Sequence, residues 1–137
     1  MIQGIAHLCF TVRDLNAAET FYVQTLGLKH AFDFRDESGR RTGVYLYAGG
    51  RNFIEMFEGS HEPAADGQSY RHVCLEVGDI DAVVEHLAGR GVETTEPHMG
   101  ADGSWQAWLT DPDGNRIELH QYTTDSKQAP CLDKPVD

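Results

Sequence analysis

Two histidines and two glutamates occupy matching places in the two halves of this 137-residue sequence. His7 aligns with His72 without a gap, because the first half reads IAHLCFTVRDLNA and the second reads YRHVCLEVGDIDA. Each half also ends in an apolar strand pattern with an acid near its centre, Glu55 in FIEMF and Glu118 in RIELH. A carboxylate in an apolar strand is unfavourable unless something compensates its charge. Two such acids, each paired with a histidine on another strand, predict a divalent metal ion.

The chemistry of the four side chains narrows the choice of ion. Two neutral imidazoles and two carboxylates balance a charge of +2, and nitrogen and oxygen donors without thiolate favour Ni, Co, Zn, Mn or Fe(II) over a structural zinc. A single histidine on an apolar strand more often packs in a core, and a single glutamate more often faces solvent. The recurrence of the same pair in both halves favours a metal site instead.

The elements that would position these residues follow the same order in each half. The first half begins with a strand over 2–12, and Asp14 caps a helix that ends at Gly27. Alternating patterns then predict three strands, at 28–35, 44–48 and 52–58. Residues on a strand share a face when they are two apart. His7, Cys9 and Thr11 therefore point to one side of the first strand.

The second half repeats this order after a linker at 59–69. Asp79 caps its helix and Gly91 ends it, and the tetrad Asp111–Gly114 predicts a tight turn. The predicted strands lie at 70–77, 92–95, 105–110 and 115–122.

Each half is thus βαβββ, and two such modules that cover each other's apolar faces predict an α+β fold. We expect a curved eight-stranded half-barrel with a cleft on its concave face, where His7, Glu55, His72 and Glu118 converge. We interpret residues 1–122 as one domain, with modules 1–58 and 70–122. The polar segment 123–137 has no periodicity and is predicted to be a mobile tail or an arm on a partner chain.

Composition excludes several functions. The net charge of -11, from 11 basic and 22 acidic residues, argues against binding to nucleic acid or to an anionic membrane. No apolar run approaches the roughly 20 residues of a membrane span, and the N-terminal residues predict a strand rather than a signal peptide. Three cysteines without a CxxC pair indicate a reducing compartment, so we expect a cytoplasmic protein.

Five segments together resemble the vicinal-oxygen-chelate superfamily over about residues 4–122, and within it the glyoxalase I (lactoylglutathione lyase) branch. They are HLCFTVRDL, FYVQTLGL, FIEMFE, HVCLEVGDI and LTDPDGNRIEL. The ligand order of His7, Glu55, His72 and Glu118 is similar to that of glyoxalase I. The resemblance implies a homodimer, often with His7 and Glu55 of one chain facing His72 and Glu118 of the other. It also implies nickel or cobalt rather than zinc, as in compact relatives.

The sequence departs from glyoxalase I where that enzyme grips glutathione. An arginine four residues after the first histidine and an asparagine four residues after the first acid are replaced here by Thr11 and Gly59. Arg71 and Arg13 are the alternative anchors for a substrate carboxylate. We expect a small-molecule substrate, with glutathione as a candidate co-substrate. The predicted substrate-binding residues are Thr11, Arg71, His120, Cys9 and Cys74. His120 shares the strand face of Glu118, so a hydrogen bond that supports this acid, or packing in the core or at the surface, is the alternative for it.

The predicted reaction is proton transfer on a substrate with two adjacent oxygens, such as an α-hydroxy carbonyl or a hemithioacetal of a 2-oxoaldehyde. Such an ion acts as a Lewis acid, and Glu118 and Glu55 are the predicted catalytic residues. A carboxylate bound to a cation is a poor base. We therefore expect the substrate to displace Glu118 into an apolar cavity, where it becomes a competent base, while Glu55 stays a ligand or acts on the opposite face.

Two other functions fit the same fold. An Fe(II) ring-cleaving dioxygenase would use His7, His72 and Glu118 as its facial triad, but Glu55 would then block a position that oxygen needs. A non-enzymatic sequestering protein, like the bleomycin-binding relatives, generally lacks metal ligands, whereas all four are present here. The metal-dependent lyase or isomerase is therefore the leading hypothesis.

Overall fold

The computed structural model describes residues 3–62 and 69–134, which form two compact units that divide between residues 63 and 64. The start of the first predicted strand, most of the predicted linker and the last three residues of the predicted tail lie outside the described residues. Among those described, no helix has both the length and the apolar character that crossing a membrane requires.

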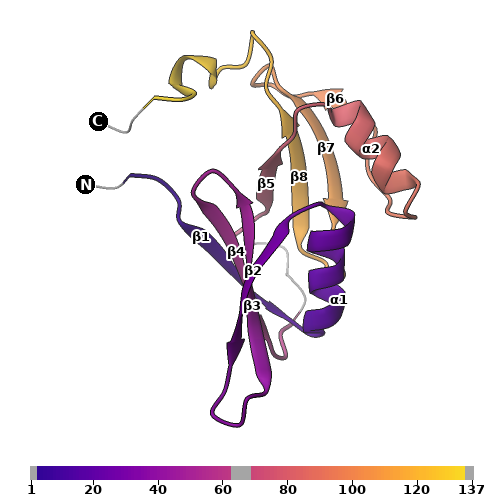
Figure 1. Cartoon of the computed structure of the whole chain (residues 1–137). Coiled ribbons are helices and arrows are strands. Elements are labelled where there is room, and N and C mark those ends of the chain that lie inside the picture. The colour runs from indigo at the N-terminus through magenta and orange to yellow at the C-terminus, as the bar shows by residue number, and fades with distance from the viewer. Residues whose placement is uncertain (1–2, 63–68, 135–137) are drawn as a thin grey trace. The chain divides into compact units, whose positions relative to one another are not determined.

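The first unit contains one helix and a four-stranded sheet in the order β1-β4-β3-β2 (Figure 1). β1 and β4 are parallel neighbours, and the other pairs are antiparallel. A π-helical turn at Thr20–Thr25 continues the helix. The bounds are β1 His7–Val12, α1 Leu15–Glu19, β2 Lys29–Arg35, β3 Arg41–Gly49 and β4 Asn52–Glu58.

The second unit repeats this arrangement with the strand order β5-β8-β7-β6, again with the first and last strands parallel. Its bounds are β5 Val73–Glu76, α2 Ile80–Ala88, β6 His98–Met99, β7 Trp105–Thr110 and β8 Arg116–Gln121. The predicted α+β class and the βαβββ repeat are therefore confirmed. The eight strands form two four-stranded sheets, and their union in one half-barrel stays a prediction.

The helices begin where the sequence predicts and cover one face of each sheet. The Asp14 carboxylate accepts hydrogen bonds from the backbone N–H groups of Asn16 and Ala17, both at 2.9 Å. Asp79 accepts one from Ala82 at 3.0 Å. α1 contacts β3 and β4, and α2 contacts β7 and β8 (Figure 1).

Burial alternates along β1 and β4, as the two-residue period of a strand requires. Phe10, Val12, Ile54 and Met56 are buried in the core, whereas His7 on β1 is exposed. Because the apolar side chains pack under the helix, His7, Cys9 and Glu55 lie on the opposite face of the sheet. The sequence pattern alone predicts this division.

Two predicted elements differ from the structure in type, and the predicted strands at 2–12 and 70–77 are shortened to β1 and β5. The first helix is not uniformly α-helical, because the Leu26 N–H bonds to the carbonyl of Phe21, five residues back, at 3.0 Å. The predicted strand at 92–95 is wrong, and the strand of this region is β6. The Val92 N–H instead donates to the Leu87 carbonyl at 3.0 Å, which closes the helix end. Thr95 is the residue that bonds to β7, through Trp108.

Residues 123–128 of the predicted tail are hydrogen-bonded to the loop before β7. The buried hydroxyls of Ser126 and Ser104 lie 2.8 Å apart, and the Thr123 hydroxyl donates to the Gly103 carbonyl at 2.7 Å. The Lys127 N–H donates to the Asp102 carbonyl at 2.8 Å. The polar side chains that suggest mobility in the sequence are the groups that attach this segment. A short 3-10 helix at Ala129–Cys131 follows.

Candidate metal centre

The first half-site, defined as His7 and Glu55, lies on neighbouring strands β1 and β4. Nε2 of His7 is 3.8 Å from Oε2 of Glu55, and their side chains are 42% and 17% exposed. Glu55 is the cross-strand partner of Cys9 on one side and of Tyr45 on the other. The His7 ring meets the Tyr45 ring edge-on, with centroids 5.6 Å apart. The acid is therefore flanked by a thiol and an aromatic ring.

The second half-site, defined as His72 and Glu118, has the same construction. Nε2 of His72 is 3.0 Å from Oε2 of Glu118, whose side chain is 9% exposed. Glu118 is the cross-strand partner of Cys74 and Trp108. The His72 ring meets the Trp108 ring edge-on at 4.8 Å. His72 itself precedes β5, which is shorter at its start than the predicted strand.

The spacing within each half-site fits two ligands of one ion. Donor atoms about 2.1 Å from a metal are about 3.0 Å apart at a right angle and about 3.4 Å apart at a tetrahedral angle. The pair His72–Glu118, at 3.0 Å, already has such a separation. The pair His7–Glu55, at 3.8 Å, is slightly wider, and the exposed His7 ring has room to adjust. Imidazole nitrogen and carboxylate oxygen also suit the ions that the sequence predicts.

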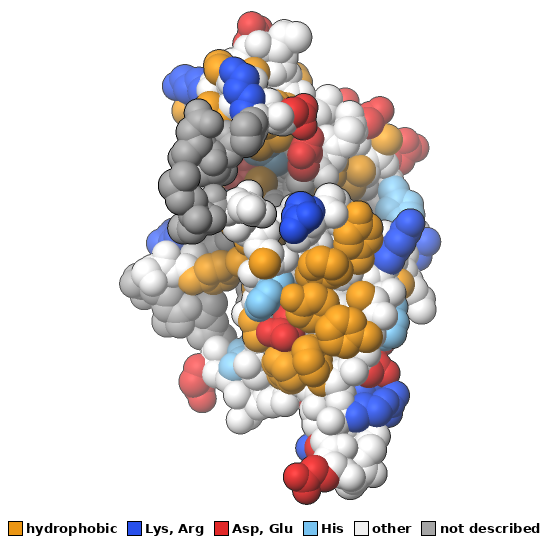
Figure 2. All heavy atoms as spheres, turned by 60° about the vertical axis from the view of Figure 1, so that its left-hand side comes forward, with side chains coloured by type: hydrophobic (Ala, Val, Ile, Leu, Met, Phe, Trp, Pro, Cys, Tyr) orange, Lys and Arg blue, Asp and Glu red, His pale blue; other side chains and the backbone are white. Residues whose placement is uncertain are grey.

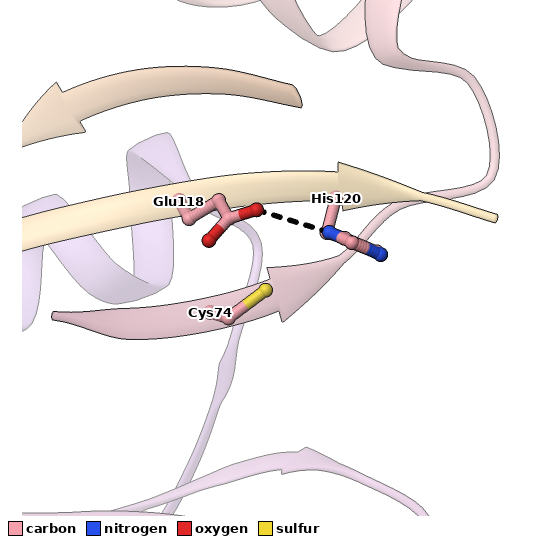
Figure 3. A group of neighbouring side chains, drawn as sticks. All are labelled: Cys74, Glu118 and His120. Atoms are coloured by element: carbon pink, nitrogen blue, oxygen red, sulfur yellow. Dashed lines mark hydrogen bonds and ion pairs between the residues drawn. The ribbon is translucent and has the colours of Figure 1, made fainter. Parts of the chain in front are cut away.

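His120 lies beside Glu118 on β8, in a buried position (Figure 3). Its Nδ1 is 3.0 Å from Oε1 of Glu118, so His72 and His120 meet different oxygens of the same carboxylate. Its Nε2 is 3.8 Å from Oδ2 of Asp102, and this buried atom makes no hydrogen bond within the described part of the chain. The sequence leaves substrate contact, support of the acid and packing open for His120, and the structure places its ring against Glu118.

The thiols of Cys9 and Cys74 lie beside the two acids. Partial burial, with the hydrogen bond and charge of Glu55, raises the pKa of Cys9 to about 11. Burial, with the negative charges of Glu118, Asp102 and Glu76, raises the pKa of Cys74 to about 12. Both thiols are therefore protonated near neutral pH, which supports a lining role rather than a nucleophilic one.

A second donor set exists within the second unit. One ligand atom each of Cys74, Glu118 and His120 lie within 4.8 Å of one another (Figure 3). Because this set shares Glu118 with the second half-site, both cannot use the same carboxylate oxygen at once. The set of Cys74, Glu118 and His120 is therefore an alternative to the second half-site.

The remaining predicted substrate-binding residues are distributed over both units. Thr11 is exposed on the His7 side of β1, and Arg71 is exposed next to His72. The guanidinium of Arg13 donates to the His61 carbonyl at 3.1 Å. Arg13 also lines a pocket with Gly59, together with Arg40, Thr42, Glu58 and Ser60. Arg13, the alternative carboxylate anchor, therefore lies beside Gly59, a position where the sequence differs from that of glyoxalase I.

Hydrophobic side chains surround a histidine and an acid on one face of the molecule (Figure 2). On the sheet of the first unit, Tyr45 stacks on Phe32 with ring centroids 4.8 Å apart and touches His7 edge-on. This aromatic surface consists of Phe32, Phe34, Tyr45, Tyr47, Phe53 and Phe57.

Comparisons with known proteins connect this geometry to a family. The model of the Glyoxalase/Bleomycin resistance protein/Dioxygenase superfamily matches residues 4–119. The glutathione transferase FosA of Serratia marcescens is 28% identical over 98% of this chain and 92% of its own length. The metallothiol transferase FosB of Staphylococcus epidermidis is 30% identical over 89% of this chain and 84% of its own.

A solved structure adds a relative that is named for binding. The chain resembles TnmS3, an antibiotic binding protein from Streptomyces sp. CB03234, with a TM-score of 0.72 and 28% identity. The match covers 89% of this chain and 98% of that one. The relatives of this fold therefore include transferases as well as a protein named for binding an antibiotic.

Proposed function

Because the chain belongs to the Glyoxalase/Bleomycin resistance protein/Dioxygenase superfamily, we propose that it is a metal-dependent lyase or isomerase of the glyoxalase I type. The observation that carries the proposal is the duplicated histidine–glutamate pair, present in both units at separations suited to adjacent ligands. The second acid, Glu55, distinguishes this set from the set of His7, His72 and Glu118 that a ring-cleaving dioxygenase would use.

The proposed ligands are His7, Glu55, His72 and Glu118. Each unit supplies only two of them, so the proposal includes a site completed by both units, from one chain or from two chains of a homodimer. Nickel, cobalt and zinc are the favoured ions, with manganese and iron as further candidates. When bound, the ion supplies Lewis acidity to two adjacent substrate oxygens.

Glu118 is the proposed proton carrier. Its Oε1 meets His120 and its Oε2 meets His72, so one oxygen is held while the other faces the side of the proposed ion. Its 9% exposure keeps water from competing for the proton. Glu55, at 17% exposure, stays a ligand or acts on the opposite face. The aromatic surface and the protonated thiols of Cys9 and Cys74 would line an environment with little water.

A second candidate function is thiol transfer to a small electrophile, which the similarity to FosA and FosB favours. Thr11 and Gly59 weaken the case for glutathione held as in glyoxalase I, but they leave other thiols open. Arg13 and Arg71 are the proposed anchors for the carboxylate of the thiol substrate, whether this is glutathione or another thiol. The similarity to TnmS3 supports ligand binding without turnover as a third outcome.

One experiment separates these functions. Purified protein is stripped of metal, reconstituted with Ni²⁺, Co²⁺, Zn²⁺, Mn²⁺ or Fe²⁺, and assayed on three kinds of substrate. These are the methylglyoxal–glutathione hemithioacetal, a panel of α-hydroxy carbonyls, and fosfomycin with glutathione or cysteine. We expect metal-dependent turnover of the hemithioacetal or of one α-hydroxy carbonyl. Turnover of fosfomycin alone would replace the proposal by thiol transfer.

The matched control is Glu55→Ala, which removes both carboxylate oxygens and leaves no ligand atom at this position. A lyase that uses four ligands should lose metal affinity in this variant. If metal affinity and turnover both stay at the wild-type level, Glu55 is not a ligand and the glyoxalase I assignment fails. Elemental analysis of the protein before stripping identifies the ion that it acquires on expression.

A further inference from the structure

The two units differ at the residue two places after each acid. In the first unit this residue is Phe57, which packs in the aromatic surface, 4.9 Å from the Phe34 ring centroid. In the second it is His120, whose side chain is 7% exposed and whose Nδ1 meets Oε1 of Glu118 at 3.0 Å. Both residues share the strand face of their acid. Only the second acid therefore has a buried hydrogen-bonding neighbour at this place.

His120 is itself backed by Asp102. Its Nε2 lies 3.8 Å from Oδ2 of Asp102, within ion-pair range but too far for a hydrogen bond. The Gln128 amide donates to the same Oδ2 at 2.6 Å, and the Ser104 N–H donates to Oδ1 at 3.3 Å. The hydrogen bond from Gln128 contributes most to holding the pKa of Asp102 below its usual value. A defined anion thus stands behind the imidazole.

The anchor of Asp102 comes from the segment after the last strand. The Lys127 N–H donates to the Asp102 carbonyl at 2.8 Å, and the hydroxyls of Ser126 and Ser104 are paired at 2.8 Å. Residues more than twenty positions apart in the sequence are joined here. The contacts form one series within the second unit, from Gln128 through Asp102, His120 and Glu118 to His72.

We propose that His120 is a positioning residue that fixes the orientation of Glu118, and that the segment 123–128 holds it in place through Asp102. The inference rests on the proposed function in one respect, the role of Glu118 as a ligand and base. Holding Oε1 leaves Oε2 directed at the His72 side, which removes rotamer freedom that would otherwise be lost on metal binding. Partners of this kind change metal affinity 10–100-fold in other proteins.

The test compares three substitutions of His120. His120→Phe introduces the residue found at the matching place of the first unit and removes both nitrogens. His120→Asn keeps a donor near the position of Nδ1, and His120→Gln keeps one near Nε2. Isothermal titration of the metal-free protein with Co²⁺ should give roughly 10–100-fold weaker binding for His120→Phe. His120→Asn should recover most of this loss, and His120→Gln should not.

The segment is tested by Gln128→Ala, with Thr124→Ala as its control because Thr124 is exposed on the same segment. Gln128→Ala should weaken Co²⁺ binding several-fold, and Thr124→Ala should leave it unchanged. Melting temperatures of all the metal-free variants separate positioning from loss of fold. Equal Co²⁺ affinity of wild type and His120→Phe would overturn the inference while leaving the proposed function intact.

A metal-free readout keeps the inference testable if the wild type binds no ion, in which case the proposed function fails separately. Ring ¹⁵N resonances of His120 should shift in Glu118→Gln and in Gln128→Ala, and unchanged resonances would refute the contact series. A thiolate-to-cobalt absorption band that is lost in Cys74→Ser but not in Cys9→Ser would also overturn it. That result would make His120 a ligand of an ion bound with Cys74 and Glu118.

Discussion

The two units present the same histidine–glutamate pair in different surroundings. In the first, the pair is 3.8 Å apart, the acid is 17% exposed, and an aromatic surface lies around it. In the second, the pair is 3.0 Å apart, the acid is 9% exposed, and His120 holds its other oxygen. Matching positions in a duplicated fold can therefore have different roles, since each role depends on the neighbours of the acid as well as on its place.

The comparison predicts unequal effects of removing the two acids. Glu118→Gln should lower kcat by about 10²–10⁴, the range of general acid–base catalysis, and retain most of the bound metal. Glu55→Gln at saturating metal should lower kcat less, because its main role is that of a ligand. Steady-state kinetics with metal content measured in parallel checks both. Equal losses in the two variants would show that the difference in surroundings has no catalytic consequence.

The segment 123–128 of the second unit predicts the next largest effect. Gly103 has a φ of +81°, and an added Cβ would lie 2.6 Å from the Asp125 carbonyl oxygen. Gly103→Ala should therefore lower the free energy of unfolding by about 1–3 kcal/mol and loosen the segment. Urea denaturation measures this change. Gly78→Ala is the control, because a Cβ there meets no atom within 4 Å, and an equally large loss in that variant would refute the steric argument.

The smallest predicted difference concerns the two cysteines beside the acids. The pKa is about 11 for Cys9 and about 12 for Cys74, both above the usual value of a thiol. Only the thiolate reacts, and below its pKa the thiolate fraction rises about tenfold per pH unit. At pH 8, Cys9 should react with iodoacetamide about tenfold faster than Cys74. Peptide mass spectrometry of timed samples gives both rates. A faster reaction at Cys74 would contradict the higher pKa of its thiol, which its deeper burial raises first and the nearby negative charges raise further.

Much of each unit could be predicted from local patterns. The bounds of β4 and β7 agree with the prediction at both ends, and Asp14 and Asp79 cap the helices as expected. In the predicted turn, Gly114 has a φ of +83° and its N–H bonds to Asp111. These features depend on alternation, capping and turn geometry, which involve residues within a few positions of each other.

The errors share a different cause. β6 pairs with β7 although its own sequence contains few apolar residues. The sequence pattern assigns Val92 to a strand, but its N–H bonds to the Leu87 carbonyl at the end of the helix. The segment after β8 is polar, yet Ser126 is buried against Ser104, 22 positions earlier. A polar residue that hydrogen-bonds to a distant residue cannot be distinguished in the sequence from one that hydrogen-bonds to water.

The sequence by itself determined the duplicated βαβββ order and the strand face that carries His7, Glu55 and Glu118. It could do so because strand alternation and helix capping are local steric and hydrogen-bonding properties. Only the tertiary structure decided that Glu118 is held by His120, and that Asp102 and Gln128 stand behind it. Those partners depend on which distant segment packs against the strand, and no local period of the sequence encodes that choice.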